Sequence, residues 1–454
     1  MMQGFLRSTW GRGVGHSRGS FQRKGFDMSN RFVRISAAAA LAAGLFAAAA
    51  QAADGRYRDY VIGDRASGMG GAAIAIAQSV DAVYYNPAGL SDTKRDSLSL
   101  SANLYGFEKM RQRNAMAPGE DASSSSFVAI PTAVGGVARF SDEWVGGFGV
   151  FTPENDKASL IASKANGEHL YTLNGSDQTL KFGPAIGWQP GGDSPWSFGA
   201  AVFGVYRSME LDVGLYRTED GQMNQAYNLK DFSLMAMLGA QYDFGGGWRA
   251  GATVQSPNLH LYGTGKRYLT MAVPDAQFQL GAYSDDVDTD NRQALQLGLG
   301  IGRSVPGQYA FGLDVLYHPS TSYDLMDWSF AHGGHDSAHV RMKDVLDFSL
   351  GGEYYVAEGW PVRAGVFTSF SAVDVPDAED SDEFLDTDVD LYGITFSVGR
   401  ETQNMGINLG IEYAFGNGHT SGYDRYAEDG QIVGGETPCK KQLILVSLST
   451  SYYF

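Results

Sequence analysis

Polar and apolar residues alternate with a period of two along most of this chain. In residues 97–107, Leu98, Leu100 and Leu104 fall on one face, whereas Ser99 and Asn103 fall on the other. This alternation is typical of a β-strand that separates two different environments. It recurs in thirteen further segments, so the sequence predicts about 14 strands, the others being residues 127–140, 144–151, 179–189, 196–216, 227–244, 248–262, 293–305, 309–318, 345–356, 361–371, 389–401, 404–415 and 442–454.

The connections between these strands alternate in length. The short ones are residues 141–143, 190–195, 245–247, 306–308, 357–359 and 402–403. The long ones are residues 108–126, 152–178, 217–226, 263–292, 319–344, 372–388 and 416–441. Outer-membrane barrels have short periplasmic turns and longer extracellular loops. The sequence therefore predicts an all-β fold, a transmembrane antiparallel β-barrel that occupies residues 96–454.

The strands also indicate which face meets lipid. Leu297, Leu299 and Ile301 alternate with glycine and polar residues, and the strand of residues 404–415 follows the same rule. Hydrocarbon cannot satisfy polar groups, so the apolar faces should point outward and the small and polar faces inward. The last strand ends on an aromatic pattern, with Tyr452 and the terminal Phe454 on one face, which resembles the C-terminal signal that such barrels present to their assembly machinery.

The N-terminus carries the pattern of an export signal. Arg31 and Arg34 precede an apolar run over residues 35–50, and Ala50-Gln51-Ala52 follows as a cleavage pattern. We interpret residues 1–52 as an upstream extension and signal peptide that are removed. A transmembrane helix is the alternative, although the run is short of about 20 strongly apolar residues.

Charge narrows the partners further. Residues 1–52 hold seven basic residues and one acidic residue, so the remaining chain has 27 basic and 50 acidic residues, a net charge of −23. A chain this acidic should not bind nucleic acid or an anionic membrane surface by electrostatics.

One stretch differs from the alternating pattern. Residues 67–90 read SGMGGAAIAIAQSVDAVYYNPAGL, a compact segment of small and apolar residues. On composition it fits a helix and turn that lead into a domain, and it is too short to fold alone. The order of its residues is more specific, because Gly-Met-Gly-Gly-Ala followed by Asn-Pro-Ala resembles the N-terminal hatch of the FadL-type outer-membrane transporters.

The resemblance implies an architecture and a function. In that family the hatch plugs a 14-stranded barrel, so residues 53–95 are expected to form a hatch that plugs the lumen. Gating residues are then expected at Asn86, Pro87, Ala88, Gly70 and Gly71. The family takes up long-chain fatty acids and other hydrophobic compounds, including aromatic hydrocarbons in the TodX branch. The implied location is the outer membrane of a Gram-negative bacterium, and the implied partners are a hydrophobic small molecule such as a fatty acid, lipopolysaccharide and the barrel assembly machinery.

A second function stays open at this stage. The Gly-Met-Gly-Gly-Ala wording also occurs in PorV-like barrels, which anchor or shuttle secreted proteins. The segment before the hatch motif carries charged residues such as Arg56, Arg58 and Asp59, which is unusual for a plug that touches an apolar ligand. The sequence does not choose among cargo molecules, and it does not give the oligomeric state.

Inward positions of the strands are candidates for contact with a ligand. The apolar candidates are Phe203, Met235, Met237 and Phe367, and the basic candidates are Lys181, Arg207, Arg249 and Arg363. Methionine suits varied apolar shapes, and a buried cation can pair with a carboxylate headgroup. The alternative is that these cations form salt bridges with inward acids such as Asp347, Glu353 and Glu412.

The third predicted strand carries Gly146, Gly147 and Gly149. Glycine within a strand often marks a bulge or a bend. In the FadL family the third strand is kinked and opens a lateral gap for cargo, so the resemblance implies a lateral-opening kink here. The alternative is that these glycines pack against the hatch.

Other reactive residues form no recognisable catalytic pattern. His332, His335 and His339 share one predicted loop, where they either bind a cation or are solvated, and the acidic loop of residues 374–390 leaves the same two alternatives. Cys439, the one cysteine, is expected as an unpaired loop thiol. We therefore expect no enzyme activity, no cofactor and no resident metal.

Overall fold

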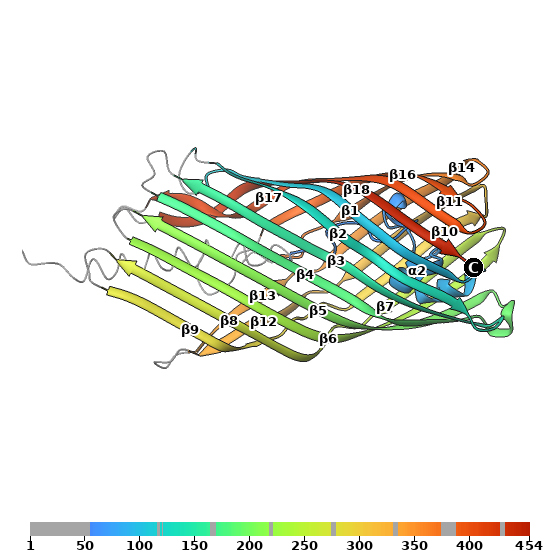
Figure 1. The fold of residues 1–454 in the computed structure, drawn as a ribbon, viewed down its shortest axis with the longest axis horizontal. Helices are drawn as coiled ribbons and strands as arrows, with labels where there is room; N and C mark the ends of the chain where they lie inside the picture. The colour runs from blue at the N-terminus through green and yellow to red at the C-terminus, as the bar shows by residue number, and fades with distance from the viewer. Residues whose placement is uncertain are drawn as a thin grey trace, which may run out of the picture.

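The computed structural model describes residues 55–115, 119, 121–163, 169–217, 221–273, 278–329, 335–373, 387–426 and 432–454. Within these residues nearly all regular structure is antiparallel β-sheet (Figure 1). The helices are η1 (Ser67–Met69), α2 (Ser79–Tyr85), η2 (Pro87–Asp92) and η3 (Pro190–Gly192). The strands are β1 (Ser97–Gln112), β2 (Ala122–Arg139), β3 (Trp144–Ser163), β4 (His169–Trp188), β5 (Trp196–Arg217), β6 (Gly221–Gly245), β7 (Trp248–Gln255), β8 (Leu259–Val273), β9 (Phe278–Thr289), β10 (Gln296–Val305), β11 (Tyr309–His318), β12 (Thr321–Ser329), β13 (His335–Met342), β14 (Val345–Ala357), β15 (Trp360–Ser369), β16 (Asp388–Glu401), β17 (Met405–Tyr426) and β18 (Ile432–Tyr453).

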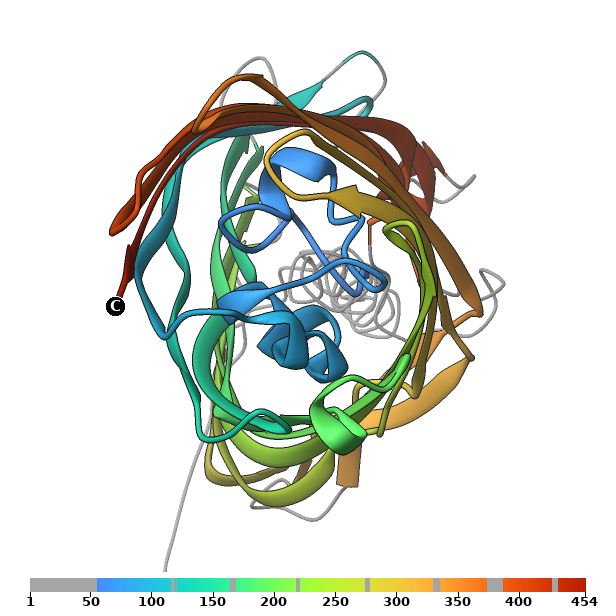
Figure 2. The same cartoon turned by 90° about the vertical axis from the view of Figure 1, so that its right-hand side faces the viewer.

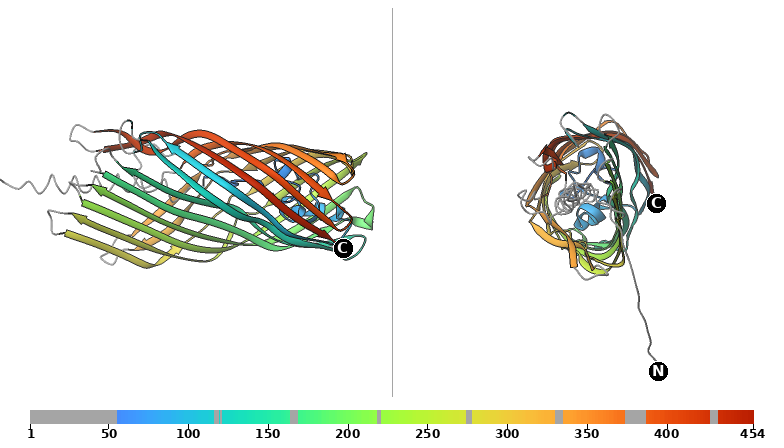
Figure 3. Two further views of the ribbon diagram at one scale, coloured as in Figure 1. Left: turned by 45° about the horizontal axis from the view of Figure 1, so that its top comes forward. Right: turned by 90° about the vertical axis from the view of Figure 1, so that its left-hand side faces the viewer.

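These segments close into a barrel of 14 antiparallel strands, as the sequence predicts. Pairing between β1 and β18 closes the ring. Four wall strands are interrupted once each, so the segments β7 and β8, β9 and β10, β11 and β12, and β13 and β14 form successive halves of single wall strands. For example, β6 pairs with β8 along one half and with β7 along the other, and Ser256-Pro257-Asn258 separates the two halves. The strands tilt across the barrel axis (Figure 3).

The predicted lipid face is confirmed. Leu297, Leu299 and Ile301 of β10 are exposed on the outside of the wall, and so are Leu409 and Ile411 of β17. Tryptophan, tyrosine and phenylalanine residues cluster near the short turns, for example Trp196 against Tyr242 with ring centroids 4.7 Å apart. Such aromatic belts mark the membrane interface of outer-membrane barrels.

The predicted long loops are partly wrong, because the strands continue far into them. β3 and β4 stay paired as far as Ser163 and Leu170, and β17 and β18 as far as Tyr426 and Ile432. These extensions escaped the pattern because their outward residues turn polar beyond the membrane. Cys439 accordingly lies in β18, where it is buried, and not in a loop.

Residues 55–96, which precede β1, lie inside the ring of strands (Figure 2). We refer to residues 55–96 as the hatch segment. It contains η1, α2 and η2, and it packs on the wall from the inside. None of the helices in the described residues is long and apolar enough to cross a membrane.

Candidate functional site

The Asn-Pro-Ala turn of the hatch segment is anchored on the barrel wall. Asn86 is fully buried, and its side-chain amide donates hydrogen bonds to the carbonyls of Ile74 (2.8 Å) and Ala240 (3.3 Å). Its side-chain oxygen accepts a bond from the backbone N–H of Ala88 (3.1 Å), which caps η2. Pro87 takes the first position of η2, where its missing N–H costs nothing. Asn86 therefore joins three chain segments through one side chain.

Glycines of the wall leave room for this turn. Gly187, Gly199 and Gly239 lie opposite one another on β4, β5 and β6. A Cβ atom on Gly199 would lie 2.2 Å from the carbonyl carbon of Pro87, and one on Gly239 would lie 2.0 Å from the side-chain oxygen of Asn86. Only glycine permits such a close approach. These three residues, here called the glycine row, form the seat of the Asn-Pro-Ala turn.

The other predicted hatch residues are also tied to the wall. Gly70 and Gly71 have positive φ angles of 63° and 80°, which glycine adopts without strain. The backbone N–H of Gly70 donates to the hydroxyl of Thr395 (3.0 Å). Asp314 of β11 accepts bonds from the backbone N–H groups of Ala73 (2.6 Å) and Ile74 (2.8 Å). The gating role of Gly70, Gly71 and the Asn-Pro-Ala turn stays a prediction. In the structure each of these residues has a contact or a backbone conformation that a substitution would disturb.

Two carboxylates hold the hatch segment together near the periplasmic end. Asp81 accepts hydrogen bonds from three successive backbone N–H groups, those of Asp64 (2.9 Å), Arg65 (3.0 Å) and Ala66 (2.9 Å). Asp64 accepts one from the hydroxyl of Ser99 in β1 (2.9 Å) and one from Ser451 in β18. Burial raises the pKa of Asp64 to about 6, and the neighbouring Asp81 adds to the effect.

Pairing between β2 and β3 stops part of the way along the barrel. The two strands pair from Arg139 and Val145 to Ala133 and Phe151, and beyond that point, in their described residues, β2 pairs with β1 and β3 with β4. If the register continued, Pro131 would lie opposite Pro153. Two prolines offer no N–H to the ladder, which explains why the pairing stops there.

The hatch segment contacts the wall at this interruption. The hydroxyl of Thr152 donates to the carbonyl of Pro131 (2.8 Å), and the hydroxyl of Tyr60 donates to the carbonyl of Thr152 (2.6 Å). Tyr60 and Thr152 are both buried. Nearer the extracellular end, the N–H of Ser159 donates to the hydroxyl of Ser124 (3.4 Å). Side chains thus replace the backbone ladder, and one of them comes from the hatch.

The predicted kink glycines lie elsewhere on β3. Gly146, Gly147 and Gly149 all sit in regular pairing with β2, before the interruption. A Cβ on Gly147 would lie 2.8 Å from the side chain of Val83 in the hatch, and one on Gly149 would lie 2.3 Å from the ring of Phe151. These distances favour packing as the role of Gly147 and Gly149.

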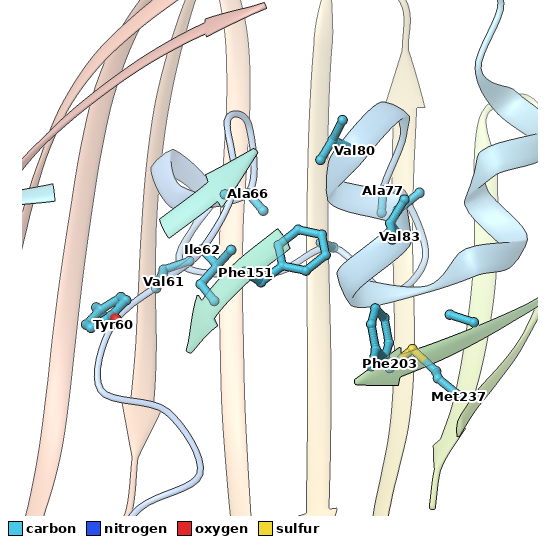
Figure 4. Close-up of a cluster of buried hydrophobic side chains, with 14 of the residues drawn as sticks. Tyr60, Val61, Ile62, Ala66, Ala77, Val80, Val83, Phe151, Phe203 and Met237 are labelled. Atoms are coloured by element: carbon cyan, nitrogen blue, oxygen red, sulfur yellow. The ribbon is translucent and has the colours of Figure 1, made fainter. Parts of the chain in front are cut away.

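A buried apolar cluster lies between the hatch and the interruption (Figure 4). The ring of Phe151 lies 5.0 Å from that of Tyr84 and 6.3 Å from that of Phe203. Met235 and Met237 of β6 belong to the same cluster. All four apolar candidates from the sequence thus belong to this cluster. The ring of the fourth, Phe367, lies 5.0 Å from the guanidinium of Arg58.

A small cavity of about 50 Å³ adjoins this cluster. Its wall combines apolar residues with polar ones, in particular Met237, Lys181, Arg58 and His318. The remaining lining residues are Tyr57, Tyr60, Ile62, Ile74, Tyr84, Tyr85, Gln255, Gln293, Ala294, Gln296, Leu316 and Asp347. Polar and apolar groups share this lining about equally, and at this volume the cavity fits a headgroup and not a whole small molecule.

The four basic candidates have different surroundings. Arg363 pairs with Glu353 (2.6 Å), Arg207 pairs with Asp177 (2.6 Å), and Arg249 pairs with Asp92 of the hatch. The salt-bridge alternative therefore holds for all three, although Asp347 and Glu412 are not their partners. Lys181 is buried beside the cavity, and none of the salt bridges found in the described part of the chain includes it.

A buried charged cluster lies on the extracellular side of the interruption. The ammonium group of Lys441 lies 2.7 Å from Glu108 and 3.3 Å from Asp156. Arg56 and Asp59 of the hatch segment approach to 3.6 Å. Burial raises the pKa of Asp59 well above its usual range, and Asp156 adds to the effect. The sequence pattern did not reveal this cluster, because these residues are dispersed over four segments.

The candidate cation-binding loops gain no support as metal sites. His332 and residues 374–386 lie outside the described residues. His339 contacts Asp324, with 2.7 Å between the ring nitrogen and the carboxylate oxygen. Among the residues that the structure describes, no group of three or more histidine, cysteine or acidic side chains has the arrangement of a metal site.

The chain is similar to known transport proteins. Alkane uptake protein A of Marinobacter nauticus is 24% identical over 371 residues, which cover 74% of this chain and 78% of that protein. A FadL homologue from Pseudomonas aeruginosa superposes with a TM-score of 0.64 at 12% identity, over 87% of this chain and 99% of the homologue. The toluene transporter TodX from Pseudomonas putida gives a TM-score of 0.61 at 16% identity, over 87% and 98%.

The similarity to these solved structures supports the fold. The family is established by the sequence match, which extends over residues 39–454. The outer-membrane location follows from that match and from the closed barrel. The chain therefore belongs to the outer membrane protein transport family OMPP1/FadL/TodX.

Proposed function

We propose that this protein carries hydrophobic compounds passively into the outer membrane and releases them sideways through the wall. The observation that carries the proposal is the interruption of the β2–β3 ladder at Phe151, where the apolar cluster of the lumen reaches the wall. An apolar molecule that leaves there enters hydrocarbon directly. It does not have to cross the polar periplasmic end of the lumen, where Asp64, Asp81 and Glu401 line a cavity of about 560 Å³.

The extracellular part of the barrel suits the capture of such a molecule. In the strand extensions the usual polarity is reversed, so Leu160, Leu211 and Leu229 are buried inside while Glu210 and Asp212 are exposed outside. The inward cluster also includes the aromatic and methionine side chains Tyr323, Trp328, Met223, Met326 and Met342. Flexible methionine side chains accept varied apolar shapes.

We propose that the hatch segment controls the exit. Tyr60 donates to the carbonyl of Thr152, and Tyr84 packs on Phe151, so the hatch contacts both residues that border the interruption. A shift of residues 57–62 would release the Thr152 carbonyl and free space beside Phe151. Asn86 and the glycine row hold the other end of the hatch segment in place, which makes the Asn-Pro-Ala turn a fixed support for that movement.

The cavity favours a cargo with an anionic headgroup, such as a long-chain fatty acid. Lys181 is buried at its edge, and Arg58 also lines it. A buried cation gains most when a carboxylate arrives with the ligand, because charge-assisted hydrogen bonds are strong in such surroundings. Relatives named for alkane and toluene uptake show that the family also serves cargo without a headgroup. A contribution of Lys181 to affinity would distinguish cargo that has a carboxylate headgroup from cargo that lacks one.

Two further expectations accompany this function. The barrel should insert with the help of the assembly machinery, to which the exposed Phe454 is available. Lipopolysaccharide should surround its extracellular half. No catalytic role is proposed, and the PorV-like alternative is not favoured, because the lumen holds an apolar cluster and a cavity rather than a continuous polar filling.

A photoreactive fatty acid with a diazirine near its tail tests the proposal. In outer-membrane vesicles we expect crosslinks to Phe151, Phe203 and Met237, the residues between the hatch and the interruption. An excess of unlabelled fatty acid should remove them. Crosslinks that are confined to the outward faces of the strands, and that persist under competition, would contradict the proposed path.

A further inference from the structure

A basic patch lies on the outside of the barrel, just above the aromatic belt of the extracellular side. The belt is marked there by Phe107 and Phe127, whose exposed rings lie 5.4 Å apart. Lys109 is two residues beyond Phe107 on β1, a step of about 7 Å along a strand. Its neighbour across β18 is Gln442, which in turn lies opposite Phe415 of β17. Lys109 is therefore at the level where aromatic side chains give way to polar ones.

Two more cations follow one step farther out. Arg111 of β1 lies directly opposite Lys440 of β18. Both are exposed, whereas the alternate residues Gln112, Cys439 and Lys441 are buried in the interior. The side chains of Lys109, Arg111 and Lys440 thus share the outer face. Like charges directly opposite each other destabilise a sheet, so this pair is costly unless an anion lies between them.

Acidic residues neutralise one of the three cations of the patch. Asp121 pairs with Arg111 at 2.8 Å and holds its guanidinium in place. Asp390 is exposed in the same row, but it lies two strands away from Lys440, beyond Asn417. Glu436 lies four residues beyond Lys440 on the same strand. No carboxylate of the described residues pairs with Lys109 or Lys440 in the salt bridges of the structure. In a chain with a net charge of −17, this local excess of positive charge is unusual.

We propose that Lys109, Arg111 and Lys440 form a binding site for the phosphate groups of lipopolysaccharide, at the seam between β1 and β18. The outer leaflet of this membrane presents phosphorylated lipid A at the level just above the aromatic belt. Cations near a membrane surface are attracted to anionic lipid, and charge-assisted hydrogen bonds from lysine or arginine to phosphate are strong. The site lies on the outer wall, so it depends on the outer-membrane location and not on the cargo of the lumen.

The test is a binding measurement on the full-length protein in detergent, with lipid A as the probe. Native mass spectrometry would compare bisphosphorylated lipid A, lipid A without phosphates and phosphatidylglycerol. The double variant Lys109→Gln/Lys440→Gln should bind bisphosphorylated lipid A roughly 25-fold more weakly, since each lost cation weakens binding about fivefold. The variant should stay folded, because both side chains are exposed.

A matched control uses two outward lysines on another part of the extracellular half. Lys230 of β6 and Lys266 of β8 are also exposed, and they lie far from the seam in the strand order. Lys230→Gln/Lys266→Gln should retain the wild-type affinity. Equal weakening in both double variants would overturn the site, and so would equal wild-type affinity for lipid A with and without phosphates. Fatty-acid uptake by Lys109→Gln/Lys440→Gln should match the wild type, which keeps this test separate from that of the transport path.

Discussion

The hydroxyl of Tyr60 donates a hydrogen bond of 2.6 Å to the carbonyl of Thr152, which joins the hatch segment to the barrel wall where the β2–β3 ladder ends. In an uninterrupted sheet that carbonyl could accept from a neighbouring strand. Here the ladder has already ended at Ala133 and Phe151, and a side chain of the hatch donates to the carbonyl instead. The same bond therefore completes the wall and fixes the plug.

The substitution Tyr60→Phe tests this connection. It removes the hydroxyl and keeps the ring, so the buried carbonyl of Thr152 loses its donor. Such a loss destabilises the structure that contains it by about 1–3 kcal/mol. Because the cost falls on the closed state, we expect the open fraction and the rate of fatty-acid uptake to rise by roughly tenfold. Uptake by vesicles gives the rate, and heat-modifiability on gels shows that the barrel remains folded. A rate equal to that of the wild type would contradict a role for this bond in closure.

The glycine row predicts a strong dependence on side-chain size. In Gly199→Ala the new Cβ would lie 2.2 Å from the carbonyl carbon of Pro87, so the Asn-Pro-Ala turn must leave its seat. We expect the hatch segment to become sensitive to added protease while the barrel stays intact. Gly352→Ala is the control, because a Cβ there meets its nearest atom at an ordinary 3.6 Å. Equal protease resistance in the two variants would show that the turn does not depend on close approach.

Lys181 should distinguish between cargo classes. In Lys181→Met the cavity keeps its apolar volume and loses a buried cation that Glu154 attracts electrostatically. A hydrogen bond to a charged group contributes about 1.5–3 kcal/mol, so fatty-acid affinity should fall by roughly 10-fold to 100-fold. Binding of an alkane of the same length should not change, and Lys181→Arg should restore part of the fatty-acid affinity. If both cargo types weaken equally, Lys181 supports the cavity and does not select the headgroup.

Asp64 predicts how hatch docking depends on pH. Its pKa of about 6 in the folded protein exceeds the value of about 3.9 for an unperturbed aspartate. Protonation therefore favours the docked state, and this contribution is full below pH 4 and is lost as the pH rises to about 6. Protease resistance of the hatch segment should fall across that interval in the wild type. Asp64→Asn should show a flatter profile, whereas an unchanged profile would assign the dependence to another group.

Much of the barrel could be predicted from the sequence, for a physical reason. Within the membrane, lipid on the outside and a polar interior impose strict alternation of apolar and polar residues along each strand. Residues such as Leu297 to Ile301 therefore indicated the lipid face, and the short turns indicated the strand order. Beyond the membrane both sides meet water, and the constraint disappears. Strands such as the outer part of β3, with Lys157 and Ser159 outside, therefore looked like loops.

The site could be predicted less well, because it depends on register. The Asn-Pro-Ala motif indicated the hatch, but nothing local shows that Gly187, Gly199 and Gly239 form one row beneath it. Pro131 and Pro153 are each visible in the sequence, yet their meeting depends on the pairing of Ala133 with Phe151. The glycines of β3 were the stronger local signal, but they lie in regular pairing, where Gly147 approaches Val83 of the hatch and Gly149 approaches Phe151 of the same strand.

The most direct test of lateral release is to close the interruption of the β2–β3 ladder with a disulfide, here called a staple. Thr132 and Thr152 would be cross-strand partners if the β2–β3 register continued, which suits a disulfide between Thr132→Cys and Thr152→Cys in a Cys439→Ser background. The control staple, Val134→Cys with Val150→Cys, joins positions that are already paired. The measurement is fatty-acid uptake before and after reduction. We predict that the first staple blocks uptake, that reduction restores it, and that the control staple has no effect. Wild-type uptake with the first staple fully formed would contradict release through this wall.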